Sequence, residues 1–131
     1  MNVKHILEGK GNAVTTISPG AKISEAARML AEARIGAVVV SDDGTTISGI
    51  LSERDIVREI ANRGATCLSD TVDTYMTFKL VTCTRNESAD NVLQMMTKGR
   101  FRHMPVVEDG VMVGLVTIGD VVKARLSELA M

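Results

Sequence analysis

Apolar and polar positions follow one another along the chain in an order that occurs twice. In the first half, apolar residues recur at spacings of three and four over residues 23–31, with charged residues between them, which predicts an amphipathic helix. The next run, 37–40, is continuously apolar, as expected for a strand covered on both faces. A turn at 42–44, a strand at 47–51 and a helix over 55–63 complete the predicted order.

The second half of the chain repeats this order. Residues 14–44 align on residues 80–110 without a gap, and the alignment continues after one deletion in the following turn. We therefore divide the chain into a first repeat at 1–66 and a second repeat at 67–131. Because a unit of about 60 residues is only marginally stable alone, the copies are expected to share one core. This predicts an α/β (α+β) fold of two pseudo-symmetric repeats, each a short mixed sheet with two helices, packed sheet to sheet.

Each repeat is preceded by a segment that we call its leader. Residues 3–7 form the first leader and residues 72–76 the second, and the two have similar sequences. A short strand follows each leader, predicted at 14–17 and at 80–83. The leaders thus extend the internal similarity beyond the repeat itself.

Two seven-residue stretches, which we call the junctions, share one pattern: Gly49–Asp55 and Gly114–Asp120. Each runs from Gly through two aliphatic residues to Ser or Thr, and places Asp three positions later. They are predicted to lie where a strand ends and a helix begins. There the hydroxyl can cap the helix, and the free N–H groups of its first turn face outward, where an anion can bind. The functional chemistry of the chain is therefore expected at the junctions.

The amino-acid composition argues against several classes of function. Aromatic residues make up 2% of the chain and the formal net charge is −1, which argues against nucleic-acid binding. No apolar run reaches the length of a membrane span, and the N-terminal residues do not resemble a signal peptide, so we expect a cytoplasmic protein. Cys67 and Cys83 are isolated and are expected to be buried apolar residues. We find no metal cluster, activated nucleophile or acid–base pair, and expect no enzyme.

The doubled junction, the strands 36–40 and 103–107 and the Val72-x-x-x-Met76-Thr77 linker together resemble a tandem pair of cystathionine-β-synthase (CBS) domains, the Bateman module. The resemblance covers nearly the whole chain, which looks like a free-standing pair. It implies pseudo-twofold packing with two clefts between the repeats, adenosine-containing ligands in these clefts, and a homodimer. It implies no synthase activity.

The resemblance and the local chemistry assign roles to individual residues. The carboxylates of Asp55 and Asp120 can hold the two hydroxyls of a ribose, and Ser52 and Thr117 can meet a phosphate. The candidate nucleotide-binding residues of the first repeat are Thr16, Ile17, Ile35, Gly36, Ala37, Val38, Ser52, Glu53, Arg54 and Asp55. Those of the second repeat are Thr82, Cys83, Arg102, His103, Met104, Pro105, Thr117, Ile118, Gly119 and Asp120.

Within these sets, three kinds of contact are expected. The backbone near Thr16–Ile17 and Thr82–Cys83 would meet the adenine edge. Its faces would lie between aliphatic side chains, namely Ile35, Val38, Met104 and Ile118. Arg102 and His103 would reach the phosphate of the nucleotide held by Asp55, which makes the first cleft the better phosphate binder.

The junctions also have a purely structural interpretation. A hydroxyl residue followed three positions later by an acid is the pattern of a capping box, which stabilises a helix without any ligand. The sequence leaves capping and nucleotide contact open, and both can apply to the same residues.

The sequence predicts a non-catalytic regulatory or sensor module. It would bind AMP, or alternatively ADP, ATP or NAD(H), and signal to a regulated protein partner by conformational change. The alternative is a structural dimerisation or protein-interaction module with no physiological nucleotide.

Overall fold

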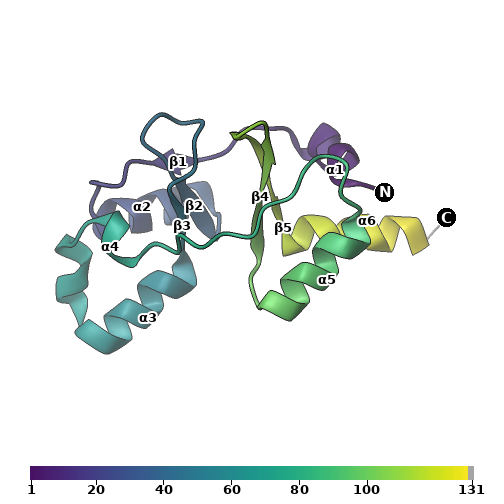
Figure 1. Cartoon of the computed structure of the whole chain (residues 1–131). Helices are drawn as coiled ribbons and strands as arrows, with labels where there is room; N and C mark the ends of the chain where they lie inside the picture. The colour runs from purple at the N-terminus through teal and green to yellow at the C-terminus, as the bar shows by residue number, and fades with distance from the viewer. Residues whose placement is uncertain (130–131) are drawn as a thin grey trace. The chain divides into compact units, whose positions relative to one another are not determined.

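The structure is a computed structural model that describes residues 1–129 and divides by contacts into two compact units (Figure 1). One unit, which we call the first-repeat unit, is Val14–Leu80. The other, the second-repeat unit, joins Met1–Ala13 to the chain from Val81 onward. Each leader therefore lies in the unit that contains the sheet of the other repeat.

The first-repeat unit contains a three-stranded mixed sheet in the order β1-β2-β3, with β1 parallel and β3 antiparallel to β2. Its elements are β1 (Thr16–Ile17), α2 (Ile23–Ala33), β2 (Ala37–Val40), β3 (Gly49–Ser52), α3 (Glu53–Arg63), the 3-10 helix η1 (Ala65–Ser69) and α4 (Val72–Tyr75). All four residues of β2 are buried, as the continuous apolar run predicts. The apolar face of α2 contributes Ile23, Ala26 and Leu30 to the same core.

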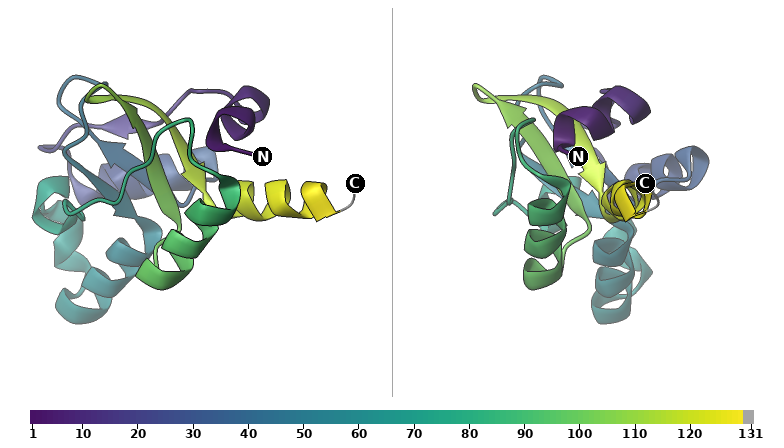
Figure 2. Two further views of the ribbon diagram at one scale, coloured as in Figure 1. Left: turned by 45° about the vertical axis from the view of Figure 1, so that its right-hand side comes forward. Right: turned by 90° about the vertical axis from the view of Figure 1, so that its right-hand side faces the viewer.

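The second-repeat unit is built on the antiparallel hairpin β4–β5. Its elements are α1 (Val3–Lys10), α5 (Ala89–Gly99), β4 (His103–Glu108), β5 (Val111–Thr117) and α6 (Ile118–Leu129). Asp109 and Gly110 form the hairpin turn with φ of 52° and 79°, the positive values that a tight hairpin turn needs. Helix α5 packs beside α6 (Figure 2), and α1 contacts both β5 and α6.

The strand predicted at 80–83 is wrong. Only Cys83 pairs with β4, through Cys83 N–H to the Pro105 carbonyl at 3.1 Å and Val107 N–H to the Cys83 carbonyl at 2.8 Å. In the first repeat, the N–H of Val39 donates to the carbonyl of Thr15 at 3.1 Å. Pro105 is the counterpart of Val39 and has no N–H, so this hydrogen bond cannot form in the second repeat.

Both junction glycines lie under a leader side chain. A Cβ at Gly114 would stand 2.7 Å from Cδ2 of Leu7, in the first leader. A Cβ at Gly49 would stand 2.7 Å from Sδ of Met76, in the second leader, and 2.8 Å from the carbonyl oxygen of Thr77. The two contacts occupy equivalent places in the repeats, and each requires the absence of a side chain on the glycine.

The predicted α/β class of two repeats is confirmed by the two small sheets and the helices that pack on them. The predicted helix over 55–63 begins two residues earlier, at Glu53. Within residues 1–129, none of the helices has the length and apolar character needed to cross a bilayer.

Candidate functional site

The first junction forms a capping box at the start of α3. The N–H of Asp55 donates to Oγ of Ser52 at 3.3 Å, and the N–H and hydroxyl of Ser52 donate to Oδ2 of Asp55 at 2.9 and 3.0 Å. Nη2 of Arg58 donates to the other carboxylate oxygen, Oδ1, at 2.8 Å. The carboxylate of Asp55 is thus hydrogen-bonded at both oxygens, and the side chain is 10% exposed.

The second junction has the same cap but a different cation. The N–H of Asp120 donates to Oγ1 of Thr117 at 3.1 Å, and the N–H of Thr117 donates to Oδ2 of Asp120 at 2.8 Å. Nζ of Lys10, at the end of α1, donates to the same Oδ2 at 2.7 Å and to the carbonyl of Leu115 at 2.9 Å. The leader helix therefore contacts the candidate ribose-binding carboxylate directly.

The electrostatic balance at Asp120 favours its charged form. Burial by itself would raise the pKa of the Asp120 carboxyl, but the hydrogen bond and charge of Lys10 and the N–H of Thr117 outweigh burial. The pKa of Asp120 consequently lies below its usual value, and the Lys10–Asp120 pair is an ion pair at neutral pH.

The capping interpretation is confirmed at both junctions. The spacing from Ser52 to Asp55 and from Thr117 to Asp120 is accounted for by the hydrogen bonds at the helix starts. The leaders account for Gly49 and Gly114. A ligand at either junction must therefore use acceptor positions of the carboxylate that the cap leaves free.

Backbone contacts bring the start of the central strand of each repeat to its junction. The N–H of Glu53 donates to the carbonyl of Gly36 at 2.9 Å, and the N–H of Ile118 donates to the carbonyl of Arg102 at 2.9 Å. Ala37 pairs with Ser52 in register, and His103 pairs with Thr117. Two candidates from the central strands thus lie next to the capping residue in each repeat.

The backbone hydrogen bonds that the segment before α2 or α5 makes to the central strand differ between the repeats. In the first repeat, the carbonyls of Thr15 and Ile17 accept from Val39 and Ser41, and Thr16 lies between them. In the second repeat, both backbone groups of Cys83 are used. Thr82 precedes Cys83, and its backbone is not part of this pairing.

Burial separates the candidates into two groups. Val38 and Met104 have 0% exposure and belong to the cores, so neither presents a face to a ligand in this structure. Also buried are Ile17, Ala37, Cys83, Pro105 and Asp55. At least partly exposed are Thr16, Ile35, Gly36, Ser52, Glu53, Arg54, Thr82, Arg102, His103, Thr117, Ile118, Gly119 and Asp120. Of the four aliphatic candidates, Ile35 and Ile118 keep exposed surface.

The candidates of each repeat lie within one unit. Those from Thr16 to Asp55 belong to the first-repeat unit, and those from Thr82 to Asp120 belong to the second-repeat unit. That Arg102 and His103 serve the nucleotide at Asp55 is a statement about two different units and stays a prediction.

Two cations that bind the junction carboxylates were not predicted from the sequence. Arg58 is three residues after Asp55 on one helix, and this i,i+3 spacing was a usable signal. Lys10 and Asp120 are 110 positions apart, and no local pattern links them. Only the placement of the first leader in the second-repeat unit brings them together.

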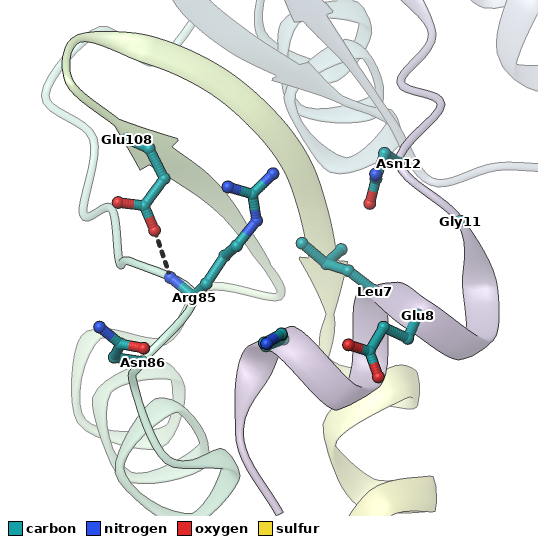
Figure 3. Close-up of a pocket in the computed structure, with 8 residues that line it drawn as sticks. Leu7, Glu8, Gly11, Asn12, Arg85, Asn86 and Glu108 are labelled. Atoms are coloured by element: carbon teal, nitrogen blue, oxygen red, sulfur yellow. Dashed lines mark hydrogen bonds between the residues drawn. The ribbon is translucent and has the colours of Figure 1, made fainter.

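A separate pocket of about 650 Å³ lies along α1 (Figure 3). Arg85 and Glu108 stand on one side of it, and Leu7, Glu8 and Asn12 on the other. Glu108 is the last residue of β4, whereas His103, beside Thr117, is the first. The pocket lining contains no residue of the second junction, but it includes Leu7, which packs on Gly114.

The cysteines have the environment of structural residues. Cys67 and Cys83 are free thiols with 1% and 6% exposure. Burial, with a smaller contribution from the carboxylates of Glu87 and Glu108, raises the pKa of Cys83 to about 12. Among residues 1–129, no three His, Cys, Asp or Glu side chains are grouped so as to hold a metal ion.

The chain is similar to known sequences over most of its length. The model of the CBS domain family matches residues 11–62 and 72–127. The CBS domain-containing protein CBSX3, mitochondrial, of Arabidopsis thaliana is 37% identical over 110 residues, which cover 81% of this chain and 53% of that protein. The CBS domain-containing protein YhcV of Bacillus subtilis is 31% identical over 114 residues, which cover 87% of this chain and 80% of that protein. The chain spans only about half the length of CBSX3.

Solved structures share the fold at full length. The CBS-domain containing protein ATU1752 from Agrobacterium tumefaciens is 46% identical with a TM-score of 0.92, over 95% of this chain and 99% of that chain. The CBS domain pair of protein MJ0100, in complex with 5′-methylthioadenosine and S-adenosyl-L-methionine, is 27% identical with a TM-score of 0.85, over 98% of both chains.

Proposed function

The chain belongs to the CBS domain family, as a tandem pair, and we propose that it is a non-catalytic regulatory module that binds an adenosine-containing ligand at its junctions. The two junctions carry the same set of groups: a capped carboxylate, a hydroxyl residue and the first N–H groups of a helix. The adenosine compounds in the MJ0100 complex support this class of ligand.

The observation that carries the proposal is the Asp120 carboxylate. Its Oδ2 is held by Thr117 and Lys10, while Oδ1 accepts no hydrogen bond from residues 1–129. A carboxylate fixed at one oxygen presents the other as a positioned acceptor for a ribose hydroxyl. Capping and ligand contact are therefore compatible at this residue.

We assign the adenine edge to the backbone of Thr16, which lies between the bonded carbonyls of Thr15 and Ile17, and to the backbone of Thr82, which directly precedes the bonded Cys83. Ile118 and Ile35 have the exposed aliphatic surface that would cover a face of the base. AMP is the ligand that we propose first, with ADP, ATP and NAD(H) as alternatives. Binding would signal to a protein partner only if the ligand favours one arrangement of the module over another.

Isothermal titration of protein verified to be ligand-free tests this function. AMP, ADP, ATP, NAD⁺, NADH and S-adenosylmethionine form the panel. We expect saturable binding of at least one compound, and the enthalpy signal should fall in Asp120→Asn and Asp55→Asn. Binding of none of the six at millimolar concentration would refute the proposal.

A second candidate function is a dimerisation or protein-interaction module, favoured by apolar side chains exposed on two helices. Val57 and Ile60 on α3 are 66% and 40% exposed, and Val122, Leu126 and Leu129 on α6 are 41%, 61% and 73% exposed. Apolar side chains that form a contiguous exposed patch mark a protein–protein interface. We propose that each of these two helix faces contacts a second copy of the chain in a homodimer.

Sedimentation equilibrium tests the dimer. The wild-type chain should have twice its 14.0 kDa mass, and Leu126→Glu should shift it toward the monomer. Lys123→Glu, on the same helix, is the control for an added charge. Thermal stability unchanged by every adenosine compound, in a chain that dimerises, would favour the interaction module over the sensor.

A further inference from the structure

Lys10 ends the leader helix α1 with its ammonium at the second junction. An ammonium has three N–H donors. Two of them donate to the carbonyl of Leu115 at 2.9 Å and to Oδ2 of Asp120 at 2.7 Å. The third finds no acceptor among residues 1–129. The position of the ammonium is thus fixed while one donor stays available.

The carboxylate of Asp120, beside Lys10, has one oxygen that could accept a hydrogen bond from a ligand. Oδ2 of Asp120 accepts from Thr117 and from Lys10, and Oδ1 is the oxygen left unused by the described residues. The side chains of Lys10 and Asp120 are 33% and 23% exposed, so solvent reaches the pair. Oδ1 of Asp120, an acceptor, and the third N–H of Lys10, a charged donor, are therefore close enough for one ligand to contact both.

The first junction lacks this combination. Both oxygens of Asp55 are used, Oδ2 by Ser52 and Oδ1 by Arg58. Lys79 occupies the place of Lys10 when the leaders are aligned, but it forms no ion pair with Asp55 in the described structure. In the described structure, a leader lysine binds the junction carboxylate at the second junction and not at the first.

We propose that Lys10 determines ligand specificity at the second junction, favouring adenosine ligands with an anionic group such as a 5′-phosphate over neutral or cationic ones. This inference rests on the proposed function. Oδ1 of Asp120 takes a ribose hydroxyl, and the third N–H of Lys10 makes a charge-assisted hydrogen bond to a phosphate oxygen. A neutral thioether in place of the phosphate gains nothing from Lys10, and a sulfonium is repelled by it.

With Lys10 in this role, the second junction is the better phosphate site, the opposite of what the sequence predicted. From the sequence, Arg102 and His103 were expected to make the first cleft the better phosphate site. At the second junction, Lys10 cancels the charge of Asp120 and leaves Arg102 as an uncompensated cation at the start of β4, without a salt bridge among residues 1–129. The local charge there suits an anion.

The test compares AMP with 5′-methylthioadenosine, which has a methylthio group in place of the phosphate. Dissociation constants are measured by isothermal titration in an Asp55→Asn background, which isolates the second junction. Lys10→Met removes the charge and keeps the aliphatic stem, and Lys10→Gln is the second uncharged variant if Lys10→Met does not fold. Lys10→Arg keeps the charge, and Lys79→Met is the matched control from the other leader.

We expect the preference for AMP over 5′-methylthioadenosine to fall about ten-fold or more in Lys10→Met, the loss expected for one hydrogen bond between charged groups. Lys10→Arg should keep most of the preference, and Lys79→Met all of it. Equal weakening of both ligands, or an unchanged preference, overturns the role of Lys10 while the proposed function stands. Failure of the Asp55→Asn protein to bind AMP overturns the role of Lys10, and the proposed function falls with it only if none of the six compounds binds the wild-type protein.

Discussion

Leu7 lies against Gly114 so closely that a Cβ on the glycine would stand 2.7 Å from Cδ2 and 2.9 Å from Cδ1 of the leucine. The first leader is thereby fixed on β5, next to the junction whose carboxylate Lys10 binds. Met76 has the same relationship to Gly49 in the first-repeat unit. The glycine that opens each junction is explained by this packing, and the leader is a structural part of the unit it joins.

Gly114→Ala should therefore lower the free energy of unfolding by about 1–3 kcal/mol, the usual cost of overpacking a core. Urea denaturation measures it. Combining Gly114→Ala with Leu7→Ala should cost less than the sum of the single changes by about 0.5 kcal/mol or more, because the smaller side chain makes room. Gly20→Ala, whose added Cβ would have no described neighbour within 4 Å, is the control. Full additivity of the two changes would contradict the contact.

Gly119→Ala should raise stability. Gly119 lies in the first turn of α6, and within residues 1–129 an added Cβ would meet Oγ1 of Thr117 at 3.6 Å, an ordinary contact distance. Alanine loses less backbone entropy than glycine in a helix, worth about 0.5–1 kcal/mol. Thermal unfolding of the ligand-free protein measures the gain, and a loss of stability would mean that the helix start is more crowded than described.

Asp120 should make stability depend on pH. Its pKa is lower in the folded state than in the unfolded chain, so its carboxylate stabilises the fold above the ordinary carboxyl pKa, about 3.9, and loses this effect as the pH falls through the folded value. Asp120→Asn should cost about 1 kcal/mol at pH 7. The difference from wild type should shrink toward zero at pH 3, as measured by urea denaturation. Asp42→Asn, in an exposed turn, serves as control, and a difference that does not change with pH would exclude the ion pair as its cause.

The thiols should be inert in the folded protein. Burial raises the pKa of Cys83 to about 12, and Cys67 is 1% exposed, so little thiolate is accessible at neutral pH. Ellman's reagent should react slowly with the native chain and rapidly with two thiols in denaturant. Fast reaction of one thiol in native protein would point to a reactive cysteine that the structure does not contain.

The pattern of the sequence was sufficient for features that local chemistry controls. The apolar run at Ala37–Val40 predicted a fully buried strand, and the spacing from Ser52 to Asp55 predicted a helix cap. The strand at 80–83 failed because pairing depends on a partner, and the partner has Pro105 where a donor is needed. Composition and local alternation carry no information about that partner.

The residues of the candidate site also fall into those that the sequence could predict and those that it could not. Both carboxylates could be located from the repeat, but their cations could not be assigned from it: Arg58 comes from the same helix as Asp55, while Lys10 comes from 110 positions away. The sequence assigned Val38 both to a strand covered on both faces and to a face of the adenine, and its 0% exposure agrees with the first assignment. Met104 also has 0% exposure and belongs to the core.

Native mass spectrometry of the ligand-free chain titrated with AMP tests the central claim, that the two junctions are adenosine-binding sites, most directly. We predict adducts of one and then two AMP per chain, at most one in Asp55→Asn or Asp120→Asn, and none in the double variant, with circular dichroism confirming that each variant is folded. Two AMP bound to the folded double variant, or none bound to the wild-type chain at millimolar concentration, would contradict the account.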